Sequence, residues 1–173
     1  MVFDLQPTLK GKLVELRPLT ADDFDELFAV ARDPLIWEQH PASDRYEEPV
    51  FREFFRAGME SGGAFLVTDA SAGQVIGSTR YFGFQEQESE IEIGWTFLAR
   101  SHWGGRHNRE MKDLMLRHAF RFVENVVFLI GPQNTRSRRA VENLGATQIA
   151  NRVDANGREV VAYQITRQSF KGL

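Results

Sequence analysis

The segment 99–109 combines the residue types that suit an anion-binding site. Gly104-Gly105 lets the backbone pass close to a ligand, and Asn108 is a good N-cap for a helix that begins near it. A helix N-terminus attracts anions because its free N–H groups and its dipole point the same way, and Arg106 and Arg109 add positive charge. These residues indicate an anion site. A capped helix with a flexible entry loop and two solvated arginines would also explain them.

Several common catalytic motifs are missing from the sequence. It contains no G-x-G-x-x-G, no Walker A phosphate loop, no G-x-S-x-G and no H-E-x-x-H. The absence of cysteine excludes a thiolate nucleophile, a disulfide framework and cysteine metal ligands. The four histidines (His40, His102, His107 and His118) show no metal-ligand spacing with carboxylates, so we expect no metal site. His118 lies on an apolar stripe, which predicts a position in the core.

The composition is that of an ordinary globular protein. The 173 residues are 42% hydrophobic and 26% charged, and they predict a single domain over residues 1–173. The net charge of -3 argues against nucleic acid as a partner. No apolar run reaches the ~20 residues that a membrane span needs, and no signal peptide is visible. We therefore expect a cytoplasmic protein that binds neither membranes nor nucleic acid.

The pattern of apolar residues predicts an alternation of strands and helices. Strands are expected over 12–17, 64–68, 74–84, 90–98, 126–130, 147–153 and 159–166. Helices are expected from Thr20 to Asp33-Pro34, from Pro49 to Ser61-Gly62-Gly63, over 108–124 and over 135–144. The order β-α-α-β-β-β-α-β-α-β-β fits neither a pure sandwich nor a doubly wound sheet. It favours a mixed α/β (α+β) fold with helices on both faces of one sheet.

Four short motifs follow one another along the chain. They are Glu92-Ile93-Gly94-Trp95, Asn108-Arg109-Glu110-Met111-Lys112, Asn134-Thr135-Arg136-Ser137 and Asn143-Leu144-Gly145-Ala146. In this order and spacing they resemble the GNAT superfamily of acyl-CoA N-acyltransferases, with a likeness that runs from about residue 9 to 166. The opening LKGKLVELRPLTADDFDELFAVARDP resembles the ribosomal-protein N-terminal acetyltransferase-like branch of that superfamily.

The resemblance implies a mostly antiparallel, about seven-stranded sheet that opens into a V between its fourth and fifth strands, here 90–98 and 126–130. It implies acetyl-CoA as the co-substrate. Pantetheine would bond to the backbone of Phe97 and Leu98, much as an added strand would, and the pyrophosphate would lie on the glycine-bearing loop. The remaining implied contacts are Gly104, Gly105, Arg106, His107, Asn108, Arg109, Asn134 and Ser137.

The loop departs from the family pattern at one position that matters for the cofactor. The family usually reads Arg/Gln-x-x-Gly-x-Gly/Ala, whereas residues 103–108 read Trp-Gly-Gly-Arg-His-Asn, so Arg106 replaces the central glycine. If that position required a positive φ, a side chain there would cost on the order of 1 kcal/mol and crowd the phosphates. Gly105 could supply the conformational freedom instead, or Arg106 could pair with a phosphate.

For the activity, the resemblance implies acetyl transfer to a primary amine on a protein N-terminus, an amino acid or another small molecule. Without cysteine, direct attack of the amine in a ternary complex is the natural mechanism. Glu92, which shares a strand face with Glu90, is the expected catalytic base, and Ser137 is the expected catalytic hydroxyl near the sulfur. Alternatively, both glutamates form a solvent-exposed strand face, and Asn134 and Ser137 only cap a helix.

The residues expected to bind the acceptor lie mostly in the N-terminal half. The two N-terminal helices and the loop 37–46 would form one wall of the acceptor site. The predicted substrate-binding residues are Trp37, His40, Arg80, Phe82 and Glu90. The final strands and Phe170 could support a homodimer. The alternative function is a catalytically weak or inactive protein that binds CoA or a partner on the same fold.

Overall fold

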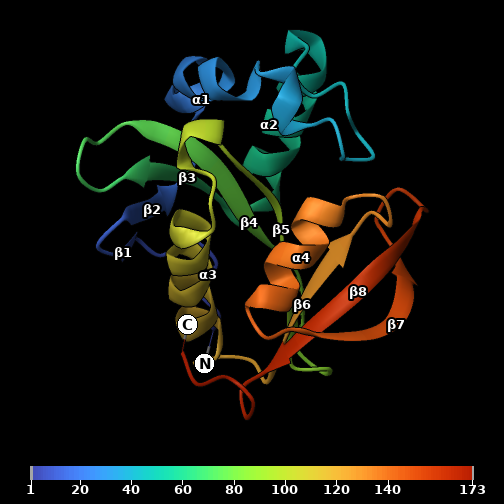
Figure 1. Cartoon of the computed structure of the whole chain (residues 1–173). Helices are drawn as coiled ribbons and strands as arrows, with labels where there is room; N and C mark the ends of the chain where they lie inside the picture. The colour runs from blue at the N-terminus through green and yellow to red at the C-terminus, as the bar shows by residue number, and fades with distance from the viewer. Residues whose placement is uncertain (1, 173) are drawn as a thin grey trace.

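The computed structural model describes residues 2–172, which contain one eight-stranded sheet (Figure 1). Its order is β1-β2-β3-β4-β5-β6-β8-β7, and β5 and β6 are its one parallel pair among the described residues. The strands are β1 (Leu9–Lys10), β2 (Val14–Pro18), β3 (Ala64–Asp69), β4 (Val75–Gln85), β5 (Glu90–Leu98), β6 (Asn125–Ile130), β7 (Thr147–Val153) and β8 (Glu159–Thr166). This sheet confirms the predicted fold class. The strand not predicted is β1, because two residues are too few to show alternation.

Helices cover both faces of the sheet (Figure 1). They are α1 (Phe24–Ala31), α2 (Glu48–Ser61), α3 (Arg106–Ala119) and α4 (Thr135–Asn143), with short 3-10 turns at Ala21–Asp23, Pro34–Ile36 and Arg100–His102. On one face, Leu27 of α1 and Phe51 of α2 belong to the same buried cluster as Trp37. On the other face, Met115 of α3 and Val141 of α4 belong to the larger cluster. No helix within residues 2–172 is long and apolar enough to cross a membrane.

Helix α3 is shifted towards the N-terminus relative to the predicted range 108–124: it begins at Arg106 and ends at Ala119. Gly105, with a φ of 95°, is its N-cap, and Asn108 lies in its first turn instead of capping it. At the other end, the backbone N–H of Arg121 bonds to a carbonyl only three residues before it, so the helix tightens and stops. The spacing of apolar residues predicted a longer helix because Val123, although it lies outside the helix, is fully buried.

The sheet opens between β5 and β6. These two strands pair over only three residues, and their last pair is Glu92 with Val127. Beyond that pair, β5 follows β4 as far as Leu98, whereas β6 follows β8 as far as Ile130. Within the described chain no strand pairs with this last part of β5 on the side of β6. The V-shaped opening lies where the resemblance to the GNAT superfamily implied it.

A bulge in β5 redirects the side chains at the opening. Three steps along β5, from Gly94 to Phe97, face two steps along β4, and Trp95 within the bulge has a positive φ of 50°. Beyond the bulge the strict alternation is broken, so Thr96 bonds to a side chain of α3 whereas Phe97 packs in the cluster of α1 and α2. Glu92 and Thr96 therefore lie on different faces of the sheet, although residues four apart in a regular strand share a face.

Candidate active site

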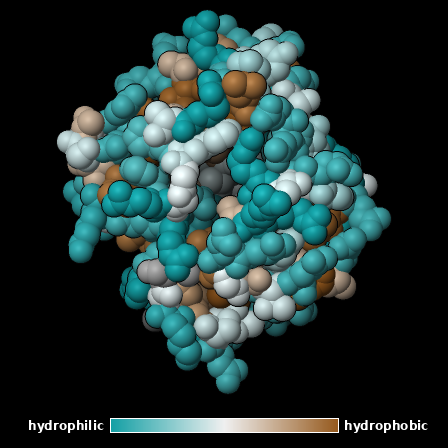
Figure 2. Space-filling model, viewed as in Figure 1, coloured by the Kyte–Doolittle hydropathy of each residue, from teal (hydrophilic) through white to brown (hydrophobic). Residues whose placement is uncertain are grey.

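A cleft of about 450 Å³ lies at the opening between β5 and β6. Its walls are the end of β5, the loop before α3, the first turns of α3, the end of β6, the start of α4 and the segment 36–45. Figure 2 shows the surface hollowed near the middle of this view, with mostly hydrophilic residues around the hollow. The volume is typical of small-molecule sites, roughly 300–1,000 Å³. The predicted site residues that line the cleft are Trp37, His40, Phe97, Leu98, Gly104, Gly105, Asn108, Asn134 and Ser137.

The other predicted site residues lie around the cleft rather than in its lining. They are Arg80, Phe82, Glu90, Glu92, Arg106, His107 and Arg109. Arg109 donates a hydrogen bond of 3.2 Å to the backbone carbonyl of Asn143, and Arg106 is exposed to solvent. Phe82 packs against Trp95, with ring centroids 5.0 Å apart.

The loop before α3 presents bare backbone to the cleft. Gly104 and Gly105 have φ values of 111° and 95°, and no side chain hydrogen-bonds to the first turn of α3 as a cap. Arg106 is the first residue of the helix and does not have a positive φ. The positive φ falls on the adjacent glycine, which removes the backbone strain foreseen for Arg106. Open N–H groups and the dipole of a 14-residue helix together suit a phosphate group.

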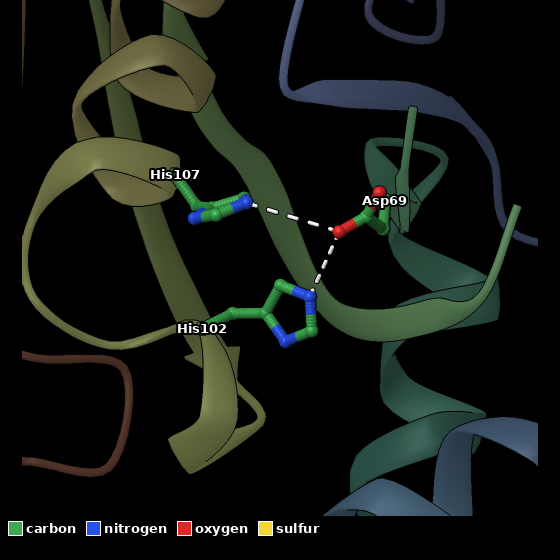
Figure 3. A group of neighbouring side chains, drawn as sticks. All are labelled: Asp69, His102 and His107. Atoms are coloured by element: carbon green, nitrogen blue, oxygen red, sulfur yellow. Dashed lines mark hydrogen bonds and ion pairs between the residues drawn. The ribbon is translucent and has the colours of Figure 1, made fainter. Parts of the chain in front are cut away.

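Two histidines at the ends of this loop converge on one carboxylate of β3 (Figure 3). Nε2 of His102 lies 2.9 Å, and Nε2 of His107 3.9 Å, from Oδ2 of Asp69. Hydrogen bonds from the hydroxyl and backbone N–H of Ser71, followed by that from His102, hold the pKa of Asp69 well below its ordinary value. The cluster attaches both ends of the loop to the turn between β3 and β4.

The same cluster offers ligand atoms of the kind that divalent transition metals take. Asp69, His102 and His107 each present one such atom, and within the described chain these atoms all lie within 4.8 Å of one another. Two imidazoles and one carboxylate are a ligand set found for zinc and iron. The sequence predicted no metal set, because Asp69 is 33 residues away from His102 and only the fold brings them together.

The N-terminus of α4 meets the cleft from the side of β6, and it is capped. Oδ1 of Asn134 accepts a hydrogen bond of 3.2 Å from the backbone N–H of Ser137. Oε1 of Gln39 accepts another, of 3.0 Å, from the backbone N–H of Arg136. Asn134 is therefore the predicted cap, and both it and Ser137 line the cleft.

Glu92 lies where β5 and β6 part, next to the cleft. Its Oε1 is 3.2 Å from the position that a Cβ on Gly94 would occupy, so the glycine makes room for the carboxylate. Gly94 itself lines the cleft. Burial raises the pKa of Glu92 to about 7, although the positive charge of Arg80 opposes this rise. A carboxyl group with a pKa near neutrality is well suited to accept a proton from a reacting amine.

Glu90, on the same strand face, has a different environment. It is only 6% exposed and forms an ion pair with Arg152 of β7, with an N–O distance of 2.5 Å. The alternative that both glutamates form a solvent-exposed face is therefore wrong. The edge strand β7 supplies a partner for Glu90 that the sequence of β5 alone could not reveal.

A buried lysine for which the sequence predicted no role also lines the cleft. Lys112 is 5% exposed, and its Nζ donates hydrogen bonds of 2.5 Å to Thr96 Oγ1 and 3.4 Å to Thr79 Oγ1. Burial lowers the pKa of Lys112 to about 7. The signal in the sequence is the four-residue spacing from Asn108, which puts both side chains on the cleft side of α3. Glu110, between them, accepts backbone hydrogen bonds from the start of β2 instead.

The segment 36–45 closes the cleft at its inner end. Trp37 is 2% exposed and packs against Phe97, with ring centroids 5.0 Å apart. Burial, followed by the charge of Arg45, lowers the pKa of His40 to about 3, so its imidazole is neutral at pH 7. Arg45 lines the cleft beside it and is a site residue that the sequence did not single out.

Comparison with known proteins identifies the family. A family model described as an acetyltransferase (GNAT) domain matches residues 14–147. The chain therefore belongs to the GNAT acetyltransferases, as its resemblance implied. This membership supports acetyl transfer from acetyl-CoA as the general activity. No curated protein matches the chain significantly.

Solved structures share the fold over nearly the whole chain. A GCN5-related N-acetyltransferase from Brucella melitensis has a TM-score of 0.79 at 21% identity, covering 95% of this chain and 80% of its own. An acetyltransferase from Agrobacterium tumefaciens has a TM-score of 0.70 at 24% identity, covering 93% and 95%. RimJ from Mycobacterium smegmatis, solved in complex with CoA-disulfide, has a TM-score of 0.71 at 19% identity, covering 95% and 88%.

Proposed function

We propose that this protein is an N-acetyltransferase that transfers an acetyl group from acetyl-CoA directly to a primary amine within a ternary complex. The observation that carries this proposal is the position of Glu92. A carboxylate with a raised pKa stands at the point where the sheet opens, beside a cleft that is lined both by the loop before α3 and by the segment 36–45. A base is needed there because an amine is protonated at neutral pH and cannot attack until it loses that proton.

Acetyl-CoA fits the cleft by its chemistry. The unpaired edge of β5 near Phe97 and Leu98 suits the amides of pantetheine, which can bond to it as an added strand would. The open first turn of α3, entered through Gly104 and Gly105, suits the pyrophosphate. The reactive thioester supplies the acetyl group and a thiolate leaving group.

The proposed steps use residues on both sides of the opening. Glu92 accepts a proton from the ammonium group of the acceptor, and the freed nitrogen attacks the thioester carbonyl carbon. The C–N bond forms as the carbonyl electrons move onto oxygen, where a backbone N–H of β5 near Phe97 or Leu98 can donate a hydrogen bond. As the C–S bond breaks, the thiolate takes up the second proton lost by nitrogen, with the hydroxyl of Ser137 as the relay beside the sulfur. The products are an N-acetyl amine and CoA.

The test measures two quantities on the purified protein. Calorimetric titration with acetyl-CoA measures binding, and release of the CoA thiol in the presence of a panel of primary amines measures transfer. We expect micromolar binding and an amine-dependent release of thiol. Binding without release for any amine would support the alternative of a catalytically inactive CoA-binding protein, and an absence of binding would overturn both.

A further inference from the structure

Two arginine side chains meet on the ring of Phe54: Arg45, which lines the inner end of the cleft, and Arg80, which does not belong to that lining. The guanidinium carbon of Arg45 lies 4.7 Å from the centre of this ring, and that of Arg80 lies 5.7 Å from it. Arg80 also lies over Trp95 at 4.5 Å, and Arg45 over Trp37 at 5.6 Å. Aromatic faces therefore hold both cations in place, which is a common way to position a guanidinium.

Neither arginine has an anionic partner. Within residues 2–172, no carboxylate forms an ion pair with Arg45 or Arg80, and Glu92 acts on Arg80 only through its charge at longer range. Arg80 is 4% exposed, and its buried Nε has no hydrogen-bond partner in the described chain. Burying a cation without a hydrogen bond or an ion pair is costly, so Arg80, next to a cleft that Arg45 lines, points to a missing anion.

His40 adds a third donor beside Arg45. Its Nδ1 lies 2.9 Å from the backbone nitrogen of Ala42, and because that N–H can only donate, Nδ1 must be the acceptor. The neutral imidazole then carries its proton on Nε2. This Nε2 lies 3.4 Å from a terminal nitrogen of Arg45, so two donors face each other with no acceptor between them. An anion placed there would satisfy both.

The charged groups around this end are unbalanced in favour of cations. Arg158 acts on both His40 and Arg45, and its nearest carboxylate, on Asp154, is 3.9 Å away. Asp44 is the acidic group that acts on Arg45. Glu92 faces Arg80 but stands closer to the opening of the sheet, where the amine must react.

We propose that the acceptor is an amine that also carries a carboxylate, with the carboxylate held by Arg45, Arg80 and the Nε2–H of His40 while the amine faces Glu92. This inference rests on the proposed acetyl transfer and names its class of acceptor. Guanidinium groups bind carboxylates in bidentate fashion, and two of them with an imidazole would fix the molecule at one end. A free amino acid has both groups, whereas a neutral amine of the same size has only one.

The experiment compares each amino acid of a panel with its own amide, which removes the carboxylate and keeps the amine. For the best acceptor we expect kcat/KM to be about 100-fold higher for the acid than for the amide, because the amide leaves the buried donors unpaired. In Arg45→Gln this ratio falls to within a few-fold of one, while the Kd for acetyl-CoA stays the same. Arg56→Gln, an exposed arginine of α2 paired with Glu53 and Glu60, removes the same charge elsewhere and should keep the ratio.

A second measurement does not depend on turnover or on the variant folding. The thermal shift of the wild-type protein loaded with acetyl-CoA is recorded with simple carboxylates and with their amides. We expect stabilisation by the carboxylates alone. Acetylation of acids and amides at equal rates, with equal shifts, would overturn the inference and leave the proposed function intact. Selective carboxylate binding without any acetylation would overturn the proposed function and with it the acceptor role of the anion site.

Discussion

The two ends of the cleft offer different chemical groups to a ligand. At the loop end, Gly104 and Gly105 offer backbone to solvent, and the first turn of α3 stays uncapped by side chains. At the inner end, Glu92 and Lys112 both have pKa values near 7, and His40 is neutral, in each case chiefly because of burial. The loop end can hold a charged group that remains partly hydrated. Glu92 and Lys112 can exchange protons at neutral pH because their pKa values lie near 7, whereas His40, with a pKa of about 3, stays neutral there.

Because the two ends differ in this way, we expect substitutions at each end to change different properties of the protein. Changes at the inner end should alter turnover, acceptor choice and the dependence of stability on pH. Changes at the loop end should alter the affinity for acetyl-CoA and little else. A substitution at the loop end that altered acceptor choice, or one at the inner end that altered only the affinity for acetyl-CoA, would contradict this division.

The largest effect is expected from Glu92→Gln. Loss of a positioned base typically lowers the rate by about 10²–10⁴-fold, so we expect turnover to fall by at least about 100-fold. The Kd for acetyl-CoA, measured by calorimetry, should stay within twofold. Glu88→Gln, in the exposed turn before β5, removes the same charge nearby and should leave both quantities unchanged. Equal turnover in the Glu92→Gln variant and the wild type would show that Glu92 is not the catalytic base.

The same carboxylate predicts a pH dependence. The base must be ionised, so kcat/KM should rise as the pH increases through about 7, and Glu92→Gln should lack this limb. For stability the sign is opposite. Because the folded pKa is raised from 4.5, the folded state binds more protons between pH 4.5 and 7, and the wild type loses stability as the pH rises through that window. Denaturant titrations at pH 5 and 8 should show this loss in the wild type and not in Glu92→Gln.

Lys112→Met should stabilise the protein at neutral pH. The folded pKa is lowered from 10.5 to about 7, so the unfolded state binds more protons between these values and the wild type gains stability as the pH rises from 7 to 10. Methionine removes the buried charge, and the two threonine hydroxyls still bond to each other at 2.8 Å. We expect a gain of about 1–4 kcal/mol at pH 7 and a flatter pH profile, measured by denaturant titration. A large loss of stability would show that the ammonium group holds the bulge in place.

The sequence predicted the elements that depend on local pattern. Strands β5, β7 and β8 have the predicted bounds, because their alternation and the Asp154-Ala155-Asn156-Gly157 turn are local signals. His118 is in the core, as its place on the apolar stripe predicted. The order of the elements was enough to predict the mixed sheet, whereas its opening, with Asn134 and Ser137 beside it, followed from the resemblance to the GNAT superfamily.

The sequence could not predict contacts that depend on distant partners. Lys112 looks like a solvated helix residue until the bulge in β5 turns Thr96 towards it. Arg45 lies in a loop with no periodic pattern, so its position over Phe54 could not be foreseen. The burial of Glu90 depends on β7, which is far along the chain. In each case the partner comes from a distant segment of the chain, which the local pattern does not reveal.

At the loop end, Gly105→Ala should weaken acetyl-CoA binding. The residue needs a φ of 95°, which a side chain disfavours by roughly 1–2 kcal/mol, and relief of that strain would rotate the first turn of α3. We expect a loss of affinity of about tenfold by calorimetry, with kcat at saturating acetyl-CoA nearly unchanged. Gly62→Ala is the matched control, because Gly62 also has a positive φ and open space around it, but lies at the C-terminal end of α2. Equal affinities in the two variants would mean that the loop is not the phosphate site.

The smallest effect is expected from His102→Ala, which detaches one end of the same loop from Asp69. This contact is one partly exposed hydrogen bond, and such surface contacts contribute little, so the Kd for acetyl-CoA should rise only about two- to fourfold. His107→Ala should have less effect still, because its Nε2 is 3.9 Å from the carboxylate instead of 2.9 Å. Both variants should keep the preference of the inner end for one acceptor over another, measured as a ratio of kcat/KM values. A change in that ratio would show that a change in the loop alters the acceptor end. The two ends of the cleft would then be structurally coupled.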